Sequence, residues 1–138
     1  MPRFSAALME HFQEPRHRGP MMAADAVGVA GTPGQGRFLA CYLRIQNQRV
    51  SDASFACNGC GVTIACGSAL VELTLGKTLA ECHSIGPEDI DRILDGIPAD
   101  VADRASFAVS ALRAALDSIT PNWPQIAEPT SGLPDRDE

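Results

Sequence analysis

The sequence contains few aromatic residues and no long apolar run. Phe, Tyr and Trp make up 5% of its 138 residues, and no apolar segment approaches the length that a membrane-spanning helix needs. Its basic residues do not form a stripe with interleaved aromatic side chains, which argues against nucleic-acid binding. The N-terminal segment lacks the apolar core of a secretory signal. We therefore expect a cytoplasmic domain without membrane or nucleic-acid contacts.

Acidic residues outnumber basic ones, but the excess is concentrated near one end. The formal net charge is −6, and the last 18 residues hold four acids and one arginine, a net −3 and thus half of the total. The same stretch is rich in proline. Because such a composition buries little apolar surface, we expect residues 1–120 to form one compact domain and residues 121–138 a weakly ordered, Pro-rich acidic tail.

Cysteine occurs in an odd number, five, which argues against a closed disulfide framework. In a reducing compartment such thiols are free for metal binding, redox chemistry or plain burial. Cys57 and Cys60 form a Cys-x-x-Cys pair, but the second pair of a zinc ribbon is missing, so a zinc site would need ligands that the fold brings in from elsewhere. Thiol–disulfide exchange between the two residues is the alternative chemistry. Cys41 and Cys66 are expected to pack in the core.

Alternating apolar residues predict a small antiparallel sheet. A weak alternation runs from Ala24 to Ala30 and is followed by a turn-rich loop over residues 31–36. Two clearer strands, Phe38–Ile45 and Val50–Cys57, are separated by four polar residues, which is typical of a hairpin. These three segments indicate a three-stranded sheet in the first half of the chain.

The remaining apolar pattern has helical periodicity. Three apolar residues recur every four positions near the N-terminus and predict a helix that Pro15 ends. Residues 62–75 are almost entirely apolar and predict a buried central helix that ends at Gly76. Further helices are expected to begin at Pro87 and after Asp103, a candidate N-cap. The order is therefore a short helix, three strands and then mostly helix.

Cys60 lies where the last predicted strand gives way, through a tight turn, to the central helix. The unpaired N–H groups and partial positive charge of a helix N-terminus favour a thiolate there, and a thiolate is both the nucleophile and the metal ligand. Gly59 and Gly61 carry no side chain, so a cluster, a sulfur donor or another protein can approach closely. The alternative is a structural cysteine in a glycine turn.

Two other motifs do not indicate a catalytic site. The three histidines lie in different segments, and none has an Asp or Ser at a spacing typical of a hydrolytic triad, so such a triad is not supported. They are His11, His17 and His83. We expect His11 and His17 to be exposed helix and loop residues. Gly76-Lys-Thr78 has the ending of a phosphate-binding loop, but Val71 stands where that loop requires a glycine.

The order and spacing of several short motifs resemble the U-type iron–sulfur cluster assembly scaffolds, IscU and the N-terminal domain of NifU. The motifs are Asp25-Ala-Val-Gly28, Gly31-Thr-Pro33, Gly59-Cys-Gly61, Gly76-Lys-Thr78 and Ala111-Leu-Arg-Ala-Ala115. The resemblance implies an α+β fold in which helices cover a three-stranded antiparallel sheet. It also implies a scaffold rather than an enzyme, working with a cysteine desulfurase and cluster-recipient proteins. The implied cargo is a 2Fe-2S cluster or zinc, unless this chain has lost metal binding altogether.

The ligand positions of this chain depart from the family pattern. The resemblance implies three cysteines and an acid around the cluster or zinc, and only Cys60 is kept. A glutamine and an arginine replace one cysteine and the acid, and an aspartate and an arginine replace a histidine and another cysteine. The candidate site residues are therefore Cys60, Gln35, Arg37, Asp103 and Arg104, with Cys60 and Cys57 as the candidate metal ligands.

Electrostatics leaves three functions open. The two arginines can offset the charge of a thiolate-held cluster, but arginine has no lone pair with which to ligate iron. Cys57, Asp103, a second subunit of a homodimer or an outside thiol would have to complete the ligands. The arginines can also stabilise a Cys60 thiolate that accepts sulfur. The chain is then a scaffold or a carrier of sulfur or a cluster, a degenerate relative that binds partners without a cluster, or a small Cys57/Cys60 thiol-redox protein.

Overall fold

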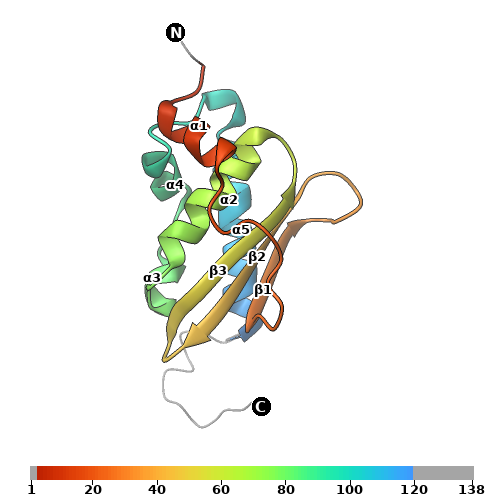
Figure 1. Cartoon of the computed structure of the whole chain (residues 1–138), viewed down its shortest axis with the longest axis vertical. Coiled ribbons are helices and arrows are strands. Elements are labelled where there is room, and N and C mark those ends of the chain that lie inside the picture. Colours follow the sequence, from red (N-terminus) through yellow and green to blue (C-terminus); the bar gives the residue numbers. More distant parts are fainter. Residues whose placement is uncertain (1–2, 120–138) are drawn as a thin grey trace.

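The computed structural model describes residues 3–119, so the predicted tail lies outside the described residues. The strands are β1 (Ala26–Gly31), β2 (Phe38–Gln46) and β3 (Arg49–Asn58). The helices are α1 (Ala6–Gln13), α2 (Gly61–Thr74), α3 (Leu79–His83), α4 (Pro87–Ile93) and α5 (Asp103–Ile119), with the 3-10 turn η1 (Ala99–Val101) just before α5. The strands form one antiparallel sheet in the order β1-β2-β3, and α2 and α5 lie behind it in Figure 1. The predicted α+β class is confirmed.

The sheet is organised by a tight hairpin between β2 and β3. Asn47 and Gln48 make the connection with φ angles of 55° and 66°, and a pair of positive φ angles matches the right-handed twist of paired strands. Along β2, alternate side chains point toward the helices and are fully buried, namely Leu39, Cys41 and Leu43. The predicted hairpin is confirmed, although two residues rather than four connect its strands.

The core lies between the sheet and the two long helices. Most of the 14 residues of α2 are buried, as expected for a nearly apolar helix, and α2 packs against β3, α1 and α5. Helix α5, which lies on the same face of the sheet as α2, packs against β1. It lies so close that a Cβ added to Gly28 would be 2.1 Å from the backbone nitrogen of Ala115. Glycine is therefore required where this strand meets this helix.

Helix α3 has no counterpart among the elements predicted from the sequence. It has five residues, too few for apolar periodicity to reveal. Its N-terminus is a capping box, in which the Thr78 hydroxyl accepts from the Glu81 N–H and the Glu81 carboxylate accepts from the Thr78 N–H. The Thr-x-x-Glu spacing was thus the signal that could have predicted it.

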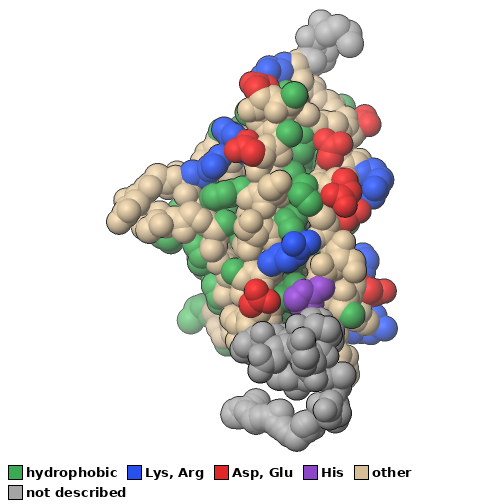
Figure 2. Space-filling view, turned by 180° about the vertical axis from the view of Figure 1, so that it is seen from behind, with side chains coloured by type: hydrophobic (Ala, Val, Ile, Leu, Met, Phe, Trp, Pro, Cys, Tyr) green, Lys and Arg blue, Asp and Glu red, His purple; other side chains and the backbone are tan. Residues whose placement is uncertain are grey.

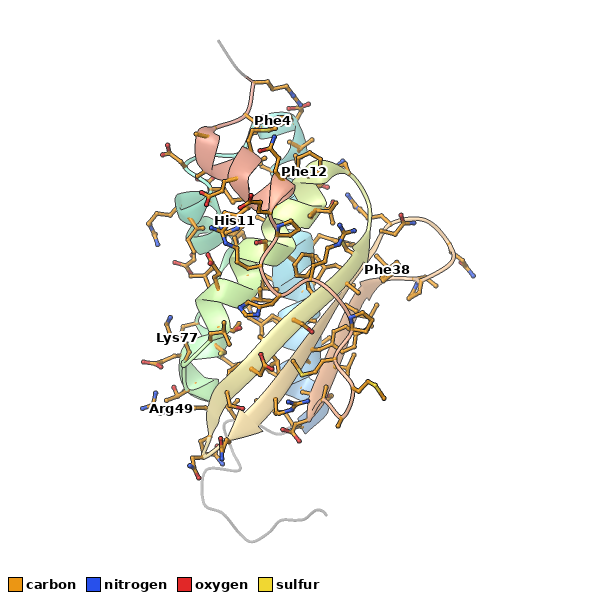
Figure 3. All side chains as sticks on the ribbon, viewed as in Figure 1. Phe4, His11, Phe12, Phe38, Arg49 and Lys77 are labelled. Atoms are coloured by element: carbon orange, nitrogen blue, oxygen red, sulfur yellow. The ribbon has the colours of Figure 1, made fainter. Side chains whose placement is uncertain are left out.

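His11 is buried, and the prediction that it is exposed was wrong. Helix α1 packs across α2, and His11 lies one turn after the buried Leu8 on the side of α1 that faces α2 (Figure 3). Its Nδ1 lies 2.7 Å from Ser68 Oγ on α2. A histidine can join the core when its ring nitrogen is paired, and that partner comes from a distant part of the chain. His17 is exposed, as predicted.

The helical face of the molecule carries charges of both signs. Seen from behind the sheet, acidic and basic side chains lie next to one another with apolar side chains between them (Figure 2). Within residues 3–119, none of the helices combines the length and the apolar character needed to cross a membrane.

Candidate functional site around Cys60

Three segments that are distant in the sequence meet near Cys60. They are the loop between β1 and β2, the junction between β3 and α2, and the first turn of α5. The sheet register pairs Phe38 with Asn58, which places the preceding residue, Arg37, beside the β3–α2 junction. The Asn58 side chain donates a hydrogen bond to a carbonyl of the β1–β2 loop at 3.4 Å, and Arg37 reaches Asp103 on α5. Strand pairing and helix packing together assemble the site.

Cys60 is the N-cap of α2 and is exposed. Its backbone is extended, and its Sγ lies 3.6 Å from the hydroxyl oxygen of Thr63 in the first turn of the helix. A Cβ added at the next residue, Gly61, would come within 2.9 Å of the ring of Phe12, so a side chain there would require the ring to move. Helix α1 therefore covers the first turn of α2 directly beside the thiol.

The Cys60 thiol is more acidic than an ordinary cysteine. Partial burial is the largest single influence and raises its pKa, whereas hydrogen bonds from the backbone N–H and the hydroxyl of Thr63 lower it. Hydrogen bonds from Arg104 and from the Val62 N–H also lower it, and together the four hydrogen bonds outweigh burial, so the pKa falls from 9.0 to about 7. A large fraction of this side chain is therefore thiolate at neutral pH.

Two arginines share the carboxylate of Asp103. Arg104 Nη1 lies 2.5 Å from Asp103 Oδ1, and Arg37 Nη1 lies 3.7 Å from Asp103 Oδ2. The Arg37 guanidinium also stacks on Phe107, 4.4 Å from the ring centroid. The hydrogen bond from Arg104 lowers the pKa of Asp103, so the carboxylate is ionised and already paired. Asp103 is the first residue of α5 rather than the N-cap that the sequence predicted.

Arg104 connects this ion pair to the cysteine. Hydrogen bonds to Asp103 and then to Cys60 raise the pKa of its guanidinium group. Its Nε atom is buried and has no hydrogen-bond partner among residues 3–119. Leaving a buried donor unpaired is costly, so an anionic group that reached this nitrogen would be bound favourably.

The structure does not bring the other two candidates, Cys57 and Gln35, into this hydrogen-bonded cluster. Cys57 is half-buried at the end of β3 and packs against the core; burial raises the pKa of its thiol, although Arg18 acts in the opposite direction. Gln35 is exposed in the β1–β2 loop, where its backbone N–H donates to Thr32 O at 3.0 Å. Across residues 3–119, no group of three or more His, Cys, Asp or Glu side chains could hold a metal ion. One chain therefore offers no complete metal site in this region.

The remaining cysteines are buried and unreactive. Burial raises the pKa of Cys41 and of Cys66 to about 12 and that of Cys82 to about 11. All three side chains are fully enclosed by the core. The prediction that Cys41 and Cys66 pack in the core is confirmed.

Three residues that shape the site were not predicted from the sequence: Phe12, Thr63 and Phe107. Thr63 stands three positions after Cys60, the spacing at which an N3 residue reaches back to an N-cap, so a signal for it was present. Phe12 and Phe107 have no such signal. They are apolar helix residues, and their contacts with the Cys60 turn and with Arg37 depend on how α1 and α5 pack.

A solved structure shares this fold. A nitrogen-fixing NifU-like protein (N-terminal) from Brucella abortus superposes with a TM-score of 0.68 over 86% of this chain and 94% of that one, at 16% sequence identity. Identity at this level shows the fold alone. The molecule is thus an α+β domain that shares the fold of this structure, with an exposed thiol of lowered pKa at the N-terminus of its central helix.

The sequence comparisons identify the family. The model of the NifU-like N terminal domain matches residues 3–121. Nitrogen fixation protein NifU from Cereibacter sphaeroides is 43% identical over 108 residues, which cover 78% of this chain and 44% of that protein. Iron-sulfur cluster assembly scaffold protein IscU 1 from Archaeoglobus fulgidus is 33% identical over 113 residues, covering 82% and 74%. The chain belongs to the NifU-like N-terminal domain family, and it spans less than half the length of the NifU relative.

Proposed function

We propose that this chain works in iron–sulfur cluster assembly as a carrier of sulfur or of a cluster, and that Cys60 holds the cargo. The family membership supports the process, since the relatives include proteins named as cluster assembly scaffolds. We assign the cargo to Cys60 because the five free cysteines differ in exposure and in pKa. Cys60 alone of the five is exposed and has a lowered pKa.

The residues around Cys60 do not fit a cluster held by one chain. Iron–sulfur clusters are held by four ligands, mostly thiolates, and the described residues contain no group of three or more suitable side chains. Asp103 is already paired with Arg37 and Arg104, and guanidinium groups cannot ligate metal. A cluster, or a zinc ion, would need ligands from outside, such as Cys57 after rearrangement, a second copy of the chain or a small thiol.

Sulfur carriage requires only what the site already contains. A Cys60 thiolate attacks the terminal sulfur of a donor persulfide, a new S–S bond forms at Cys60, the donor's S–S bond breaks, and the donor leaves as a thiolate. The exchange is redox-neutral and needs no further reactant. The terminal sulfur on Cys60 is then anionic, and the N–H donors of Arg104 are placed to stabilise it. The chain acts as a carrier and not as an enzyme.

The partners follow from this chemistry and from the family. A persulfide donor of the cysteine desulfurase class supplies the sulfur, and proteins that build or receive clusters take it up. Because Cys60 must stay reduced to accept sulfur, we place the reaction in a reducing, cytoplasmic setting. Gln35 is exposed in the β1–β2 loop two residues before Arg37, and we include it in the proposed contact surface.

Sulfur loading tests the proposal directly. The wild-type chain, Cys60→Ser and Cys41→Ser are each incubated anaerobically with a cysteine desulfurase and free cysteine, and their intact masses are measured. We expect the wild type and Cys41→Ser to gain the mass of sulfur and to lose it on reduction, while Cys60→Ser stays unchanged. Equal loading of all three proteins would contradict the role of Cys60.

Anaerobic reconstitution with iron and sulfide separates the two cargoes. Without added thiol we expect little bound iron, because one chain lacks ligands. Iron that binds with charge-transfer absorption in the wild type, and is absent in Cys60→Ser, would show that a cluster rather than sulfur is carried. Analytical ultracentrifugation of that sample would then reveal whether a second copy supplies the missing ligands.

The missing ligand set also favours a second candidate, a relative that binds assembly partners without carrying cargo. It predicts that neither sulfur nor iron is taken up, while Cys60→Ser still binds the same partners. A thiol-redox role would instead require a reversible bond between Cys57 and Cys60, seen as the loss of two hydrogens in the intact mass after mild oxidation.

A further inference from the structure

The groups that point at the Cys60 sulfur are hydrogen-bond donors, and the most exposed of them is Arg104. This residue lies in the first turn of α5 and donates to the sulfur. Its Nε atom is buried, and no acceptor within residues 3–119 pairs with it. Because an unpaired buried N–H is costly, the atom favours an acceptor that comes from outside the chain. Arg104 therefore offers an unpaired donor beside the thiol.

Arg37 supplies a second guanidinium group, which is joined to the first through Asp103. It stands at the end of the β1–β2 loop and stacks on Phe107, with its guanidinium carbon 4.4 Å from the ring centroid. Its Nη1 lies 3.7 Å from Asp103 Oδ2, which is too long for a hydrogen bond. The aromatic ring thus holds the guanidinium in place, while the N–H groups in its plane remain available to an acceptor.

The arginines of this cluster outnumber its acid. Asp103 is the carboxylate that both guanidinium groups share, and Asp100, which also acts on Arg104, is paired with Arg3 at 2.6 Å. One positive charge is therefore left over beside the Cys60 sulfur. Guanidinium groups bind carboxylate and phosphate oxygens through paired N–H···O bonds, and a sulfonate group presents oxygens of the same kind. The cluster can thus hold an oxyanion next to a nucleophilic sulfur.

We propose that Cys60 also accepts sulfur directly from a small sulfane-sulfur oxyanion of the thiosulfate class, whose sulfonate group Arg37 and Arg104 bind. The inference rests on the proposed function, because the product is the same Cys60 persulfide. It adds a small-molecule source of sulfur to the protein donor. Cys60 is exposed, so an anion of this size can reach its sulfur.

The transfer balances without a further reactant. The Cys60 thiolate attacks the outer sulfur of thiosulfate, a new S–S bond forms at Cys60, and the S–S bond within thiosulfate breaks. The electron pair of that bond leaves with the sulfur that carries the oxygens, which departs as sulfite. Arg37 and Arg104 stabilise the negative charge on this leaving group, and Arg104 also lies beside the new terminal sulfur. No electron is exchanged with a third molecule.

Loading from two donors separates this inference from the proposed function. The wild-type chain is incubated anaerobically with thiosulfate alone, or with a cysteine desulfurase and free cysteine, and is then desalted. Cyanide releases the bound sulfane sulfur as thiocyanate, which is quantified, and sulfite is measured in the thiosulfate sample. We expect sulfur on the chain in both samples. Loading from the desulfurase but not from thiosulfate overturns the inference and leaves the proposed function intact, whereas loading from neither overturns both.

Substitutions then test the site itself. We expect Cys60→Ser to take up no sulfur from thiosulfate, and Arg37→Gln and Arg104→Gln each to load about five-fold more slowly because they lose charge-assisted hydrogen bonds to the sulfonate. Arg92→Gln is the matched control and should load at the wild-type rate, since Arg92 pairs with Asp89 on α4. Equal rates in the wild type and in both cluster variants would contradict the role of the arginines.

A pair of alkylating reagents measures anion binding even if a variant fails to fold. Iodoacetate is anionic, iodoacetamide is its neutral analogue, and both attack the same Cys60 thiolate, so the ratio of their rates is independent of how much thiolate is present. We expect this ratio to be about ten-fold higher in the folded wild type than in urea, and to fall when excess sulfate competes for the arginines. The same ratio in the folded and unfolded chain, or no effect of sulfate, overturns the proposed oxyanion site.

Discussion

Helix α2 carries two cysteines, six residues apart, that differ strongly in chemistry. Cys60 stands at the open first turn, is exposed and has a pKa of about 7, whereas Cys66 lies fully buried and has a pKa of about 12. The first turn supplies hydrogen-bond donors to the Cys60 sulfur, while the core removes water from Cys66 without supplying equivalent donors. Position along one helix thus separates a reactive thiol from an inert packing residue.

The largest expected effect of the difference in pKa between Cys60 and Cys66 is that alkylating reagents modify Cys60 selectively. At pH 7.5 most of Cys60 is thiolate, while Cys66 is thiolate only in trace amounts, so their alkylation rates should differ on the order of 10,000-fold from ionisation alone. Iodoacetamide labelling followed by peptide mass spectrometry measures both rates in one sample. The same reaction in denaturant provides the control, because the difference should disappear when the chain unfolds. Comparable labelling in the folded state would show that the two environments are not as distinct as the structure indicates.

A second experiment changes the surroundings of Cys60, and not those of Cys66, by adding metal ligands beside it. Gln35→Cys, Arg37→Asp and Arg104→Cys together restore the ligand types of the family around a single helix start. We expect zinc affinity to rise at least about 100-fold, since thiolates and a carboxylate replace two guanidinium groups, which cannot bind metal, and an amide, which binds zinc poorly. Competition with a chromophoric chelator measures it, and the same variant with Cys60→Ser is the control. No gain in affinity would mean that these loops are wrongly aligned with the family.

Removing the Thr63 hydroxyl should reduce the difference in pKa between Cys60 and Cys66. Thr63→Val keeps the shape of this buried side chain but deletes a hydrogen bond to the thiolate, so the pKa of Cys60 should rise toward 9.0. The alkylation rate of Cys60 at pH 7 should fall by about five-fold, with the inflection of the pH–rate profile displaced upward. Thr74→Val, at the far end of α2, is the matched control and should leave the profile in place. An inflection that stays near pH 7 in Thr63→Val would show that the hydroxyl does not lower the pKa of Cys60.

Arg104→Gln is expected to have the smallest effect. The guanidinium stabilises the Cys60 thiolate, but Asp103 neutralises much of its charge at 2.5 Å and solvent screens the rest. We expect a roughly two-fold slower alkylation at pH 7, which high salt should diminish in the wild type. Arg92→Gln is the control, because Arg92 pairs with Asp89 on α4. A faster reaction in Arg104→Gln would reverse the sign that we assign to this residue.

The elements that the sequence predicted well are those with local patterns. Strand alternation and polar turn residues revealed the hairpin, and an apolar run identified α2, because each signal depends on residues a few positions apart. Helix α3 was missed, since five residues carry no periodicity and only its capping box marks it. The placement of Cys60 at the start of α2 was also a local prediction, and it was correct.

The surroundings of the site were predicted only in part. The resemblance to the family pointed to Arg37, Asp103 and Arg104, and the structure places these three side chains in one ion-pair cluster. It does not reveal a contact between that cluster and Gln35. His11 was wrongly predicted to be exposed, because its partner Ser68 stands 57 residues away in the chain.

The sequence by itself determined the order of strands and helices and the presence of a thiol at a helix start, because hydrogen bonding within a turn or hairpin depends on near neighbours. The tertiary structure alone decided that Arg104 reaches the Cys60 sulfur and that Cys41, Cys66 and Cys82 are fully buried, and it brought His11 onto Ser68. Burial, charge pairing and the direction of donors act through space between distant segments. Their effect on a side chain is therefore set only when the sheet register and the helix packing have formed.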